Sequence, residues 1–482
     1  MKAYQLLLAG ALLLGPATVS MAQTDTKAVV EQTKQLIKTK GADFDKQLKD
    51  LYKANKKNAD ALVAIGRTFY NNKDLANATK FADYALAKNS KDADAHILKG
   101  DIAVSNDDGS TAAQEYQQAI YFAPKNTDAY YKYAMILRGR NPEDAVATLE
   151  ELRKQVPDYP VDALAARIYY HTKNPNLEKA ASYYDKVADV TKMEDEDIKD
   201  YATIEWMLGN KDKSIEVAKA GLTKDPKWST LNRLVFWNST DKNYTDQALE
   251  YADRLFNRSD SANVTADDYA YYGTALKQAK RWDDAIKAYS TSLDYLAKDN
   301  NAIVSKPILY KNLSDVYNEK GDYDNALQYV EKSIEAKENP TFSDYNGLGS
   351  QYLEIATKLS QAKDVAGAKA AYKKADETYA KIAEKYPEQA NYCNYVRGSI
   401  NSALDPDSKL GLAKPYYEAL ASSLEAKTDR TENQTAMLKT AYQYMIVYEY
   451  NVKQNKAAAK VWAEKMLAVD PTNEIAKQVK NL

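Results

Sequence analysis

The sequence is short of the residues that most catalytic and metal-binding sites require. It contains one cysteine, Cys393, and two histidines, His96 and His171, in 482 residues. A single cysteine excludes an intramolecular disulfide framework and every multi-cysteine zinc or iron–sulfur site. The 16 glycines and 13 prolines are too few for low-complexity linkers. The 66 basic and 68 acidic side chains nearly cancel, which argues against a chain-wide basic field for nucleic acid.

The sequence also lacks the short motifs of common catalytic sites. It has no G-x-x-x-x-G-K-S/T, H-E-x-x-H or G-x-S-x-G pattern. Neither histidine has a Cys or Ser at motif spacing, so we expect structural roles for both. Cys393 is expected to be a small buried residue, with a reactive thiol as the alternative. The acidic run from Glu194 to Asp197 is expected to favour a helix start, with calcium binding as the alternative. We therefore expect neither catalysis nor a cofactor or metal site.

One long apolar run is present, at residues 6–15, and it follows the positively charged Lys2. Small residues, Ser20 and Ala22, then precede Gln23. This is the layout of a secretory signal, with cleavage expected before Gln23. The alternative is a retained membrane anchor, but the run is shorter than the roughly 20 residues that span a bilayer. No cysteine follows it, which excludes lipidation of the bacterial lipoprotein type. We expect an exported protein of a bacterial periplasm or cell surface.

Small residues recur at a nearly constant spacing along the rest of the chain. Gly66, Gly100 and Ala134 lie 34 residues apart, and ten of the eleven members of this series are Gly, Ala or Ser. A second, coupled series begins at Ala78 and Ala112 and contains ten alanines and one serine. Regular spacing at this period indicates a repeat architecture. Each unit predicts two antiparallel helices, with small residues where their backbones approach.

The turn inside a unit is clearest in the segment 307–336. Pro307 suits the first turn of a helix. Gly321 can adopt the left-handed conformation that closes this helix, and an aspartate after it can cap the next. The segment therefore predicts a helix, a tight turn and a second helix.

At these positions the chain resembles the tetratricopeptide repeat family. Two segments carry the resemblance well: 58–92, with Leu62, Gly66, Phe69 and Ala78, and 93–126, with Gly100, Ala112, Tyr116 and Pro124. The resemblance implies an all-α fold, a right-handed α-α superhelical solenoid of about eleven helix-turn-helix repeats. The expected organisation is a signal peptide at 1–22, an N-terminal helical cap at 23–58, regular repeats at 59–340, repeats with insertions at 341–472 and a C-terminal capping helix at 473–482.

The chain has 39 tyrosines against 7 phenylalanines, an excess typical of a binding surface. The family register instead places many of them in the core. Those at the main second-helix core position are Tyr116, Tyr184, Tyr289, Tyr372 and Tyr417. A phenol at the edge of a thin core can keep its hydroxyl in water, so packing explains much of the excess.

The resemblance also implies that the first helices line a concave groove that holds a partner. The groove candidates carried over by register are Arg67, Tyr70, Tyr131, Arg138, Lys199, Trp206, Arg233, Trp237, Lys277 and Lys311. The same register places Asp101 on this face. Trp206, Arg233 and Trp237 come from adjacent repeats and are expected to form one patch, and the alternative is that each tryptophan packs between repeats. The Lys/Asn clamp that some family members use for a peptide carboxyl terminus is absent, because Asp315 stands where an amide is needed.

These observations predict a non-catalytic scaffold that binds a protein or peptide in the groove. The alternative is a glycan- or nutrient-binding component of a surface uptake complex, with Trp206 and Trp237 as sugar platforms. No nucleic acid partner, no cofactor and no transmembrane segment after signal removal are expected.

Overall fold

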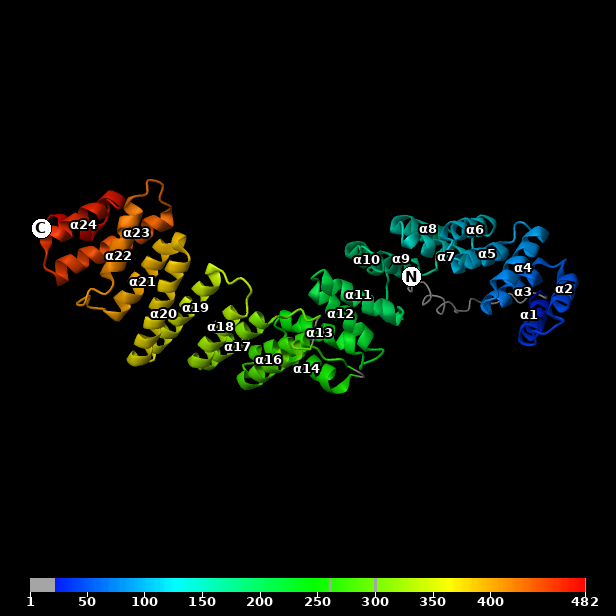
Figure 1. Ribbon diagram of the computed structural model, residues 1–482, viewed down its shortest axis with the longest axis horizontal. Helices are drawn as coiled ribbons and strands as arrows, with labels where there is room; N and C mark the ends of the chain where they lie inside the picture. Colours follow the sequence, from blue (N-terminus) through cyan, green and yellow to red (C-terminus); the bar gives the residue numbers. More distant parts are fainter. Residues whose placement is uncertain (1–21, 260–261, 299–300, 482) are drawn as a thin grey trace. The chain divides into compact units, whose positions relative to one another are not determined.

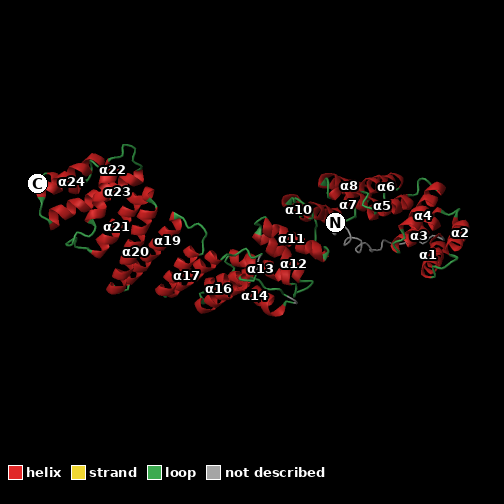
Figure 2. Ribbon diagram, viewed as in Figure 1, coloured by secondary structure: helices red, strands yellow, loops and turns green. Residues whose placement is uncertain are grey.

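The computed structural model describes residues 22–259, 262–298 and 301–481, and every regular element in these ranges is helical (Figure 2). The chain divides into two compact units, Met1–Val235 and Phe236–Leu482. Within the described ranges, no helix is both long and apolar enough to cross a membrane. The expected signal at 1–22 lies outside the described residues, except for Ala22 at the start of the first helix.

The helices of the first unit follow one another as antiparallel neighbours (Figure 1). Their bounds are α1 (Ala22–Lys38), α2 (Phe44–Asn55), α3 (Ala59–Asn71), α4 (Leu75–Lys88), α5 (Ala93–Ser105), α6 (Gly109–Phe122), α7 (Thr127–Arg138), α8 (Pro142–Gln155), α9 (Val161–Tyr170), α10 (Leu177–Tyr184), the 3-10 turn η1 (Val190–Lys192), α11 (Asp195–Met207) and α12 (Lys211–Leu222). The division between the units falls inside α13 (Ser229–Asp241).

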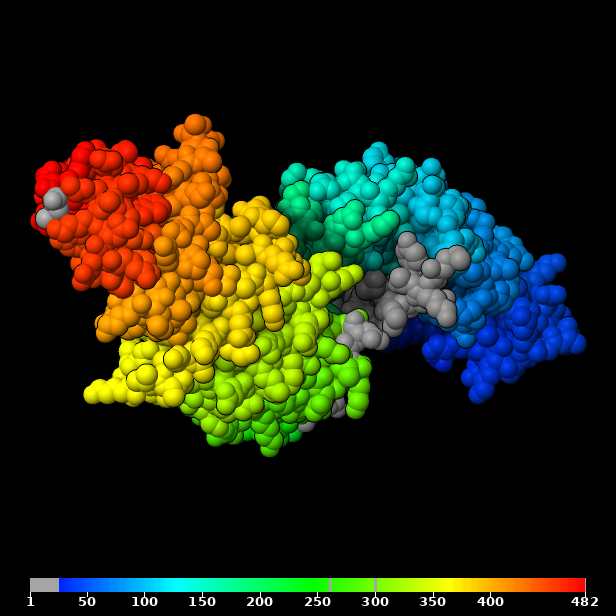
Figure 3. Space-filling model, turned by 60° about the vertical axis from the view of Figure 1, so that its left-hand side comes forward, coloured from blue at the N-terminus to red at the C-terminus, as the bar shows by residue number. Residues whose placement is uncertain are grey.

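The second unit continues the same alternation, and its last repeats, yellow to red, pack against one another in chain order (Figure 3). Its elements are α14 (Thr245–Asp253), the π-helical η2 (Arg254–Arg258), α15 (Ala266–Gln278), α16 (Trp282–Leu296), α17 (Lys306–Lys320), α18 (Tyr323–Glu335), α19 (Phe342–Gln361), α20 (Val365–Lys385), the 3-10 turn η3 (Pro387–Gln389), α21 (Ala390–Leu404), α22 (Lys414–Glu425), α23 (Glu432–Val447), the π-helical η4 (Tyr448–Val452), α24 (Lys456–Val469) and α25 (Glu474–Lys480). From α3 on, odd-numbered helices are the first, and even-numbered helices the second, of each pair up to α24. The predicted all-α solenoid of helical pairs is confirmed.

The first helices α3, α5 and α7 begin at equivalent capping residues. The Oδ1 atoms of Asn58, Asp92 and Asn126 accept hydrogen bonds from the backbone N–H three residues on, at 3.1, 3.0 and 3.1 Å. Such caps satisfy N–H groups that have no partner within the helix. In the segment 307–336, Gly321 has a φ of 86° and Asp322 caps α18, as the sequence predicts. One local signal thus starts the first helix in these three repeats, whereas α9, α11, α17 and α21 begin without a side-chain capping bond.

The small crossing residues make room for tyrosine rings from the second helix of the same pair. A Cβ on Gly273 would lie 2.7 Å from the ring of Tyr289, which is fully buried. The same relationship joins Gly349 to Tyr379 at 2.7 Å. Tyr372, which the register places at the core position, is half-buried and packs against the core two helical turns earlier. The insertion at 358–366 lengthens α19 and α20 instead of forming a loop, which shifts the second helix relative to the first.

Candidate functional site

The first helices of successive pairs contact one another directly. In the first unit α3 contacts α5 and α9 contacts α11, and in the second unit α15 contacts α17 and α21 contacts α23. We call the surface that these odd-numbered helices form the first-helix face. In a solenoid the helices that approach each other from repeat to repeat line the inner side of the stack, where extended partners bind.

A buried carboxylate joins three consecutive first helices of the first unit. Asp101 of α5 is 3% exposed and forms an ion pair with Arg67 of α3. Its Oδ1 accepts hydrogen bonds from the Lys132 ammonium of α7 and the Tyr116 hydroxyl, both at 2.7 Å. Burial and the Asp101 charge raise the pKa of Tyr116, so its hydroxyl remains a donor. We call Arg67, Asp101, Tyr116 and Lys132 the Asp101 network.

One further candidate, Tyr70, lies beside this network. Tyr70 is buried, and the Ser105 hydroxyl donates to its phenolic oxygen at 3.2 Å. The Arg67 guanidinium lies 5.7 Å from the centre of the Tyr70 ring. Arg67 and Tyr70 therefore both make contacts that hold α3 against α5, and the Arg67 side chain remains 32% exposed.

Carboxylates crowd the same face at the starts of α5 and α7. Partial removal from water and the neighbouring Asp92 raise the pKa of Asp94, against the opposing charge of Arg67. For Asp128, partial removal from water raises the pKa most; Lys132 opposes this rise and Asp101 adds to it. Their ionised forms are disfavoured in the folded chain.

A second set of pairs ties α9 to α11. The Arg167 guanidinium donates to both carboxylate oxygens of Asp197, with Nε at 2.5 Å and Nη2 at 2.6 Å. His171 Nε2 lies 2.5 Å from Oδ2 of Asp200, whose side chain is 4% exposed. Tyr131 of α7 lies close enough to Arg167 to affect the guanidinium pKa. These bonds span about one repeat of sequence and fix the spacing of the first helices.

The acidic run from Glu194 to Asp197 occupies the start of α11, as expected from its favourable charge at a helix amino terminus. Asp195 pairs with Lys224 at 2.5 Å, and Glu196 pairs with Lys199. Throughout the described ranges, no group of three or more His, Cys, Asp or Glu side chains is placed to hold a metal ion.

A hollow of about 730 Å³ opens on the first-helix face beside these pairs. It includes one sequence candidate, Lys199. The lining residues come mainly from α11 and from the end of α9 with the loop that follows it, and are Tyr170, His171, Thr172, Pro175, Glu196, Lys199, Asp200, Thr203, Met207 and Thr230.

The remaining candidates have different surroundings. Trp206 and Arg233 are half-buried in the first unit, and Arg138 is half-buried with its Nη1 3.9 Å from the Met135 sulfur. In the second unit Lys277 is half-buried, and Lys311 is exposed and pairs with Asp315 at 2.8 Å.

Trp237 of the second unit packs between repeats. Trp237 is 7% exposed, and its ring stacks on that of Tyr271 with the two ring centroids 4.8 Å apart. The indole N–H donates to Oδ1 of the buried Asp268 at 3.1 Å. The packing alternative is thus the one that fits Trp237.

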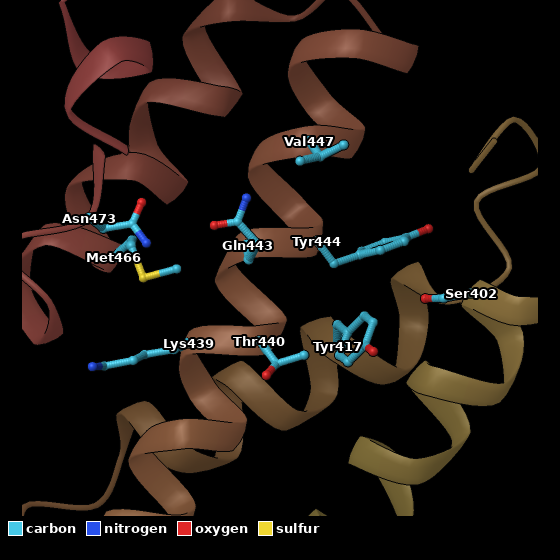
Figure 4. Close-up of a pocket in the computed structure, with 9 residues that line it drawn as sticks. All are labelled: Ser402, Tyr417, Lys439, Thr440, Gln443, Tyr444, Val447, Met466 and Asn473. Carbon is cyan, nitrogen blue, oxygen red and sulfur yellow. The ribbon is translucent and has the colours of Figure 1, made fainter. Parts of the chain in front are cut away.

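A second hollow, of about 480 Å³, lies on the first-helix face at the end of the second unit (Figure 4). Its lining comes mostly from α23 and comprises Ser402, Tyr417, Lys439, Thr440, Gln443, Tyr444, Val447, Met466 and Asn473. The sequence candidates include none of these residues. They follow the insertion at 403–410, where the repeat register no longer identified the exposed face.

Cys393 lies inside the packing of α21 and is fully buried. Burial raises the pKa of its thiol to about 11, against the opposing charge of Arg397. A protonated, buried thiol is a poor nucleophile, which fits the expected structural role.

Comparison with known proteins supports the repeat assignment. Residues 137–191 match the family model described as tetratricopeptide repeat. The C-terminal part of a tetratricopeptide-repeat protein from Cytophaga hutchinsonii is 24% identical, with 58% of this chain and 98% of that chain covered and a TM-score of 0.42. A tetratricopeptide repeat protein from Parabacteroides merdae is 13% identical, with 61% and 100% covered and a TM-score of 0.27. No curated protein matches the chain.

The family match covers α8, α9 and α10. Helical pairs with small residues where the two helices cross continue along the rest of the described chain. Residues 137–191 thus match the tetratricopeptide repeat family, whose members generally serve as non-catalytic scaffolds for protein partners, and the rest of the described chain is built from helical pairs of the same kind.

Proposed function

We propose that the chain is an exported bacterial scaffold that holds a protein or peptide on its first-helix face and carries out no catalysis itself. The observation that carries this proposal is the Asp101 network, which fixes three first helices by bonds through one buried carboxylate. A face that is already ordered loses little conformational freedom when a partner docks.

The proposed location in the periplasm or on the cell surface rests on the signal-like pattern at 1–22. Fractionation of the host cells and amino-terminal sequencing of the mature chain test it. A mature chain that starts at Gln23 in the exported fraction is expected. A full-length chain confined to the cytoplasm would contradict this part of the proposal.

The partner site is tested by photocrosslinking in the native host. A photoreactive phenylalanine analogue replaces Tyr131, a half-buried residue of α7 that lies near Arg167 of α9. The matched control replaces Tyr121, which lies on the second helix α6 and is 76% exposed. We expect a protein adduct from position 131 that position 121 does not give. Equal adducts at both positions, or none at 131 in folded exported protein, would contradict the proposal.

The alternative of a glycan- or nutrient-binding component relied on Trp206 and Trp237 as platforms. Trp237 is buried and its N–H is bonded to Asp268, so one of the two proposed platforms offers no open ring face. Nothing specific in the described residues favours this alternative over a polypeptide partner.

A further inference from the structure

The hollow on α23 differs from the rest of the first-helix face in its hydrogen bonding. Most charged groups on the face of the first unit are engaged between repeats, as in the Asp101 network and the Arg167–Asp197 pair. In the hollow, the side-chain amide of Gln443 has no hydrogen-bond partner among the described residues, although it is half-buried. A glutamine amide can donate two hydrogen bonds and accept two.

Two further donors lie near Gln443. The Lys439 ammonium bonds to Asp470 at 3.1 Å, which leaves N–H groups unused. Oδ1 of Asn473 caps α25 by accepting from the Ala476 N–H at 2.9 Å, and its Nδ2 has no partner within the described part of the chain. Figure 4 shows the polar groups of Lys439, Gln443 and Asn473 gathered on one side of α23.

The walls of the hollow supply apolar contact, and their aromatic rings pack on one another. Val447 and Met466 line it. The ring of Tyr444 lies between Tyr417, at 5.0 Å, and Tyr448, at 6.0 Å, measured between ring centroids. A sugar ring usually stacks on an exposed aromatic face, and these rings pack on each other instead. The combination of surplus N–H donors and aliphatic walls suits a chain of amides with apolar side chains.

We propose that this hollow is a subsite for the main chain of an extended polypeptide. The amide of Gln443 pairs with one residue of the extended peptide, donating to the C=O of that residue and accepting from its N–H. Lys439 and Asn473 donate to neighbouring backbone carbonyls, and an apolar side chain of the peptide contacts Val447. This assignment rests on the proposed function, since it presumes a polypeptide partner, and it adds where on the second unit the partner is held and by which groups.

The test uses the full chain and a phage-displayed library of random linear peptides. The peptide selected most strongly is synthesised, and its Kd is measured for the wild-type protein and for variants. Gln443→Ala removes the free amide and is expected to weaken binding about tenfold, the effect of two lost hydrogen bonds. The matched control is Gln328→Ala, an exposed glutamine on the second helix α18, which is expected to leave the Kd unchanged.

A second variant separates binding from folding. Asn473→Asp keeps an oxygen that caps α25 but removes the Nδ2 donors, so we expect weaker peptide binding at unchanged melting temperature. The control Asn455→Asp makes the same change at the cap of α24, outside the hollow. N-methylation of the peptide amide that contacts Gln443 is expected to reproduce the loss in the wild-type protein and to have no further effect in Gln443→Ala.

The outcomes distinguish the two proposals. A peptide that binds Gln443→Ala and Asn473→Asp with wild-type affinity overturns the subsite and leaves the proposed function standing. A library that yields no binding peptide overturns the subsite, whereas the proposed function, which includes folded protein partners, is tested by the crosslink from position 131. On a glycan array, a sugar whose binding is lost in Gln443→Ala would overturn the assignment of the hollow to a polypeptide.

Discussion

The ring of Tyr116 occupies the space that a side chain at residue 100 would need, because a Cβ on Gly100 would lie 2.4 Å from ring atom Cε1. The hydroxyl of the same tyrosine donates to Asp101. The Tyr116 side chain thus packs the two helices of one repeat together and also bonds to the carboxylate that pairs with Arg67 and Lys132 of the neighbouring repeats. Tyr417 packs over Gly398 in the same way, because a Cβ on Gly398 would lie 2.6 Å from ring atom Cε1 of Tyr417.

Gly100→Ala should therefore destabilise the first unit. The Tyr116 ring must move, and overpacking of this kind costs about 1–3 kcal/mol. The free energy of unfolding from urea titration measures it. Gly109→Ala is the control: a Cβ there would meet nothing within 4 Å, and we expect no loss of stability. Equal effects of the two changes would contradict the packing role of residue 100.

Asp101→Ala should cost more than a surface carboxylate does. It leaves Arg67 and Lys132 without their shared partner in a largely buried position, and breaking a buried pair costs about 3 kcal/mol or more. Asp83→Ala, which removes an exposed partner of Lys99, should cost less than about 1 kcal/mol. Chemical denaturation of both variants gives the comparison, and a cost for Asp101→Ala as small as that for Asp83→Ala would contradict the network.

Asp128→Asn should stabilise the chain at neutral pH. The pKa of Asp128 is raised in the folded protein, so ionisation above that pKa disfavours the fold, and the neutral amide avoids this effect. The gain should fade as the pH falls through the folded pKa, because the wild-type carboxyl is then protonated.

Asp344→Asn provides a comparison of opposite sign. Hydrogen bonds from Lys337 and Thr341 outweigh the opposing effect of burial and lower the pKa of Asp344. Its ionised form stabilises the fold at neutral pH, so Asp344→Asn should lose stability there. Melting temperatures between about pH 4 and pH 7 test both variants, and the same sign for both would contradict the assignments.

His96 should stabilise the fold only while it is protonated. Its Nδ1 lies 2.6 Å from Glu115 and its Nε2 lies 3.2 Å from the Ser90 carbonyl, so both ring nitrogens face acceptors. Burial alone would lower the pKa of His96, but the bonds to Glu115 and Ser90 raise it above 6.5. The stabilisation is therefore complete below the unfolded pKa and is lost as the pH rises through the folded pKa.

The measurement is the stability difference between the wild type and His96→Gln as a function of pH. We expect this difference to decrease as the pH rises from about 6 to about 9. His171→Gln, which removes the partner of Asp200, serves as a second histidine variant for comparison. A difference for His96→Gln that is independent of pH would show that folding does not shift the pKa of His96, and would contradict the prediction.

The sequence predicted the helical pairs because their signals are local or periodic. Gly321 closes its helix in the left-handed conformation, and Tyr116 and Tyr289 are buried at the positions that the repeat register assigns. The register did not identify Tyr379 as the ring that packs over Gly349, because the insertion at 358–366 extends two helices by whole turns. A helix that lengthens by whole turns keeps its 3.6-residue pattern of apolar side chains. A single sequence therefore does not reveal that the second helix has shifted along the first.

The pairing of charged residues between repeats was not readable from the sequence. Arg67 and Asp101 lie 34 residues apart, and their register alone places both on one face without joining them. The groove candidates therefore stay a prediction about the partner, and the structure adds that Arg67, Tyr70 and Lys199 also make contacts within the chain. The sequence candidates did not include Gln443, because it has neither a charge nor an aromatic ring. What distinguishes it is a side-chain amide without a hydrogen-bond partner among the described residues.

The measurement that tests the central claim most directly is the yield of protein adduct from a photoreactive residue at 131 relative to the yield at 121. Both positions carry tyrosine and belong to the first unit, and they differ in lying on a first helix and a second helix. The account predicts a defined partner captured at 131 and little or none at 121. A partner captured at 121 and not at 131 would place the binding surface on the second helices and contradict it.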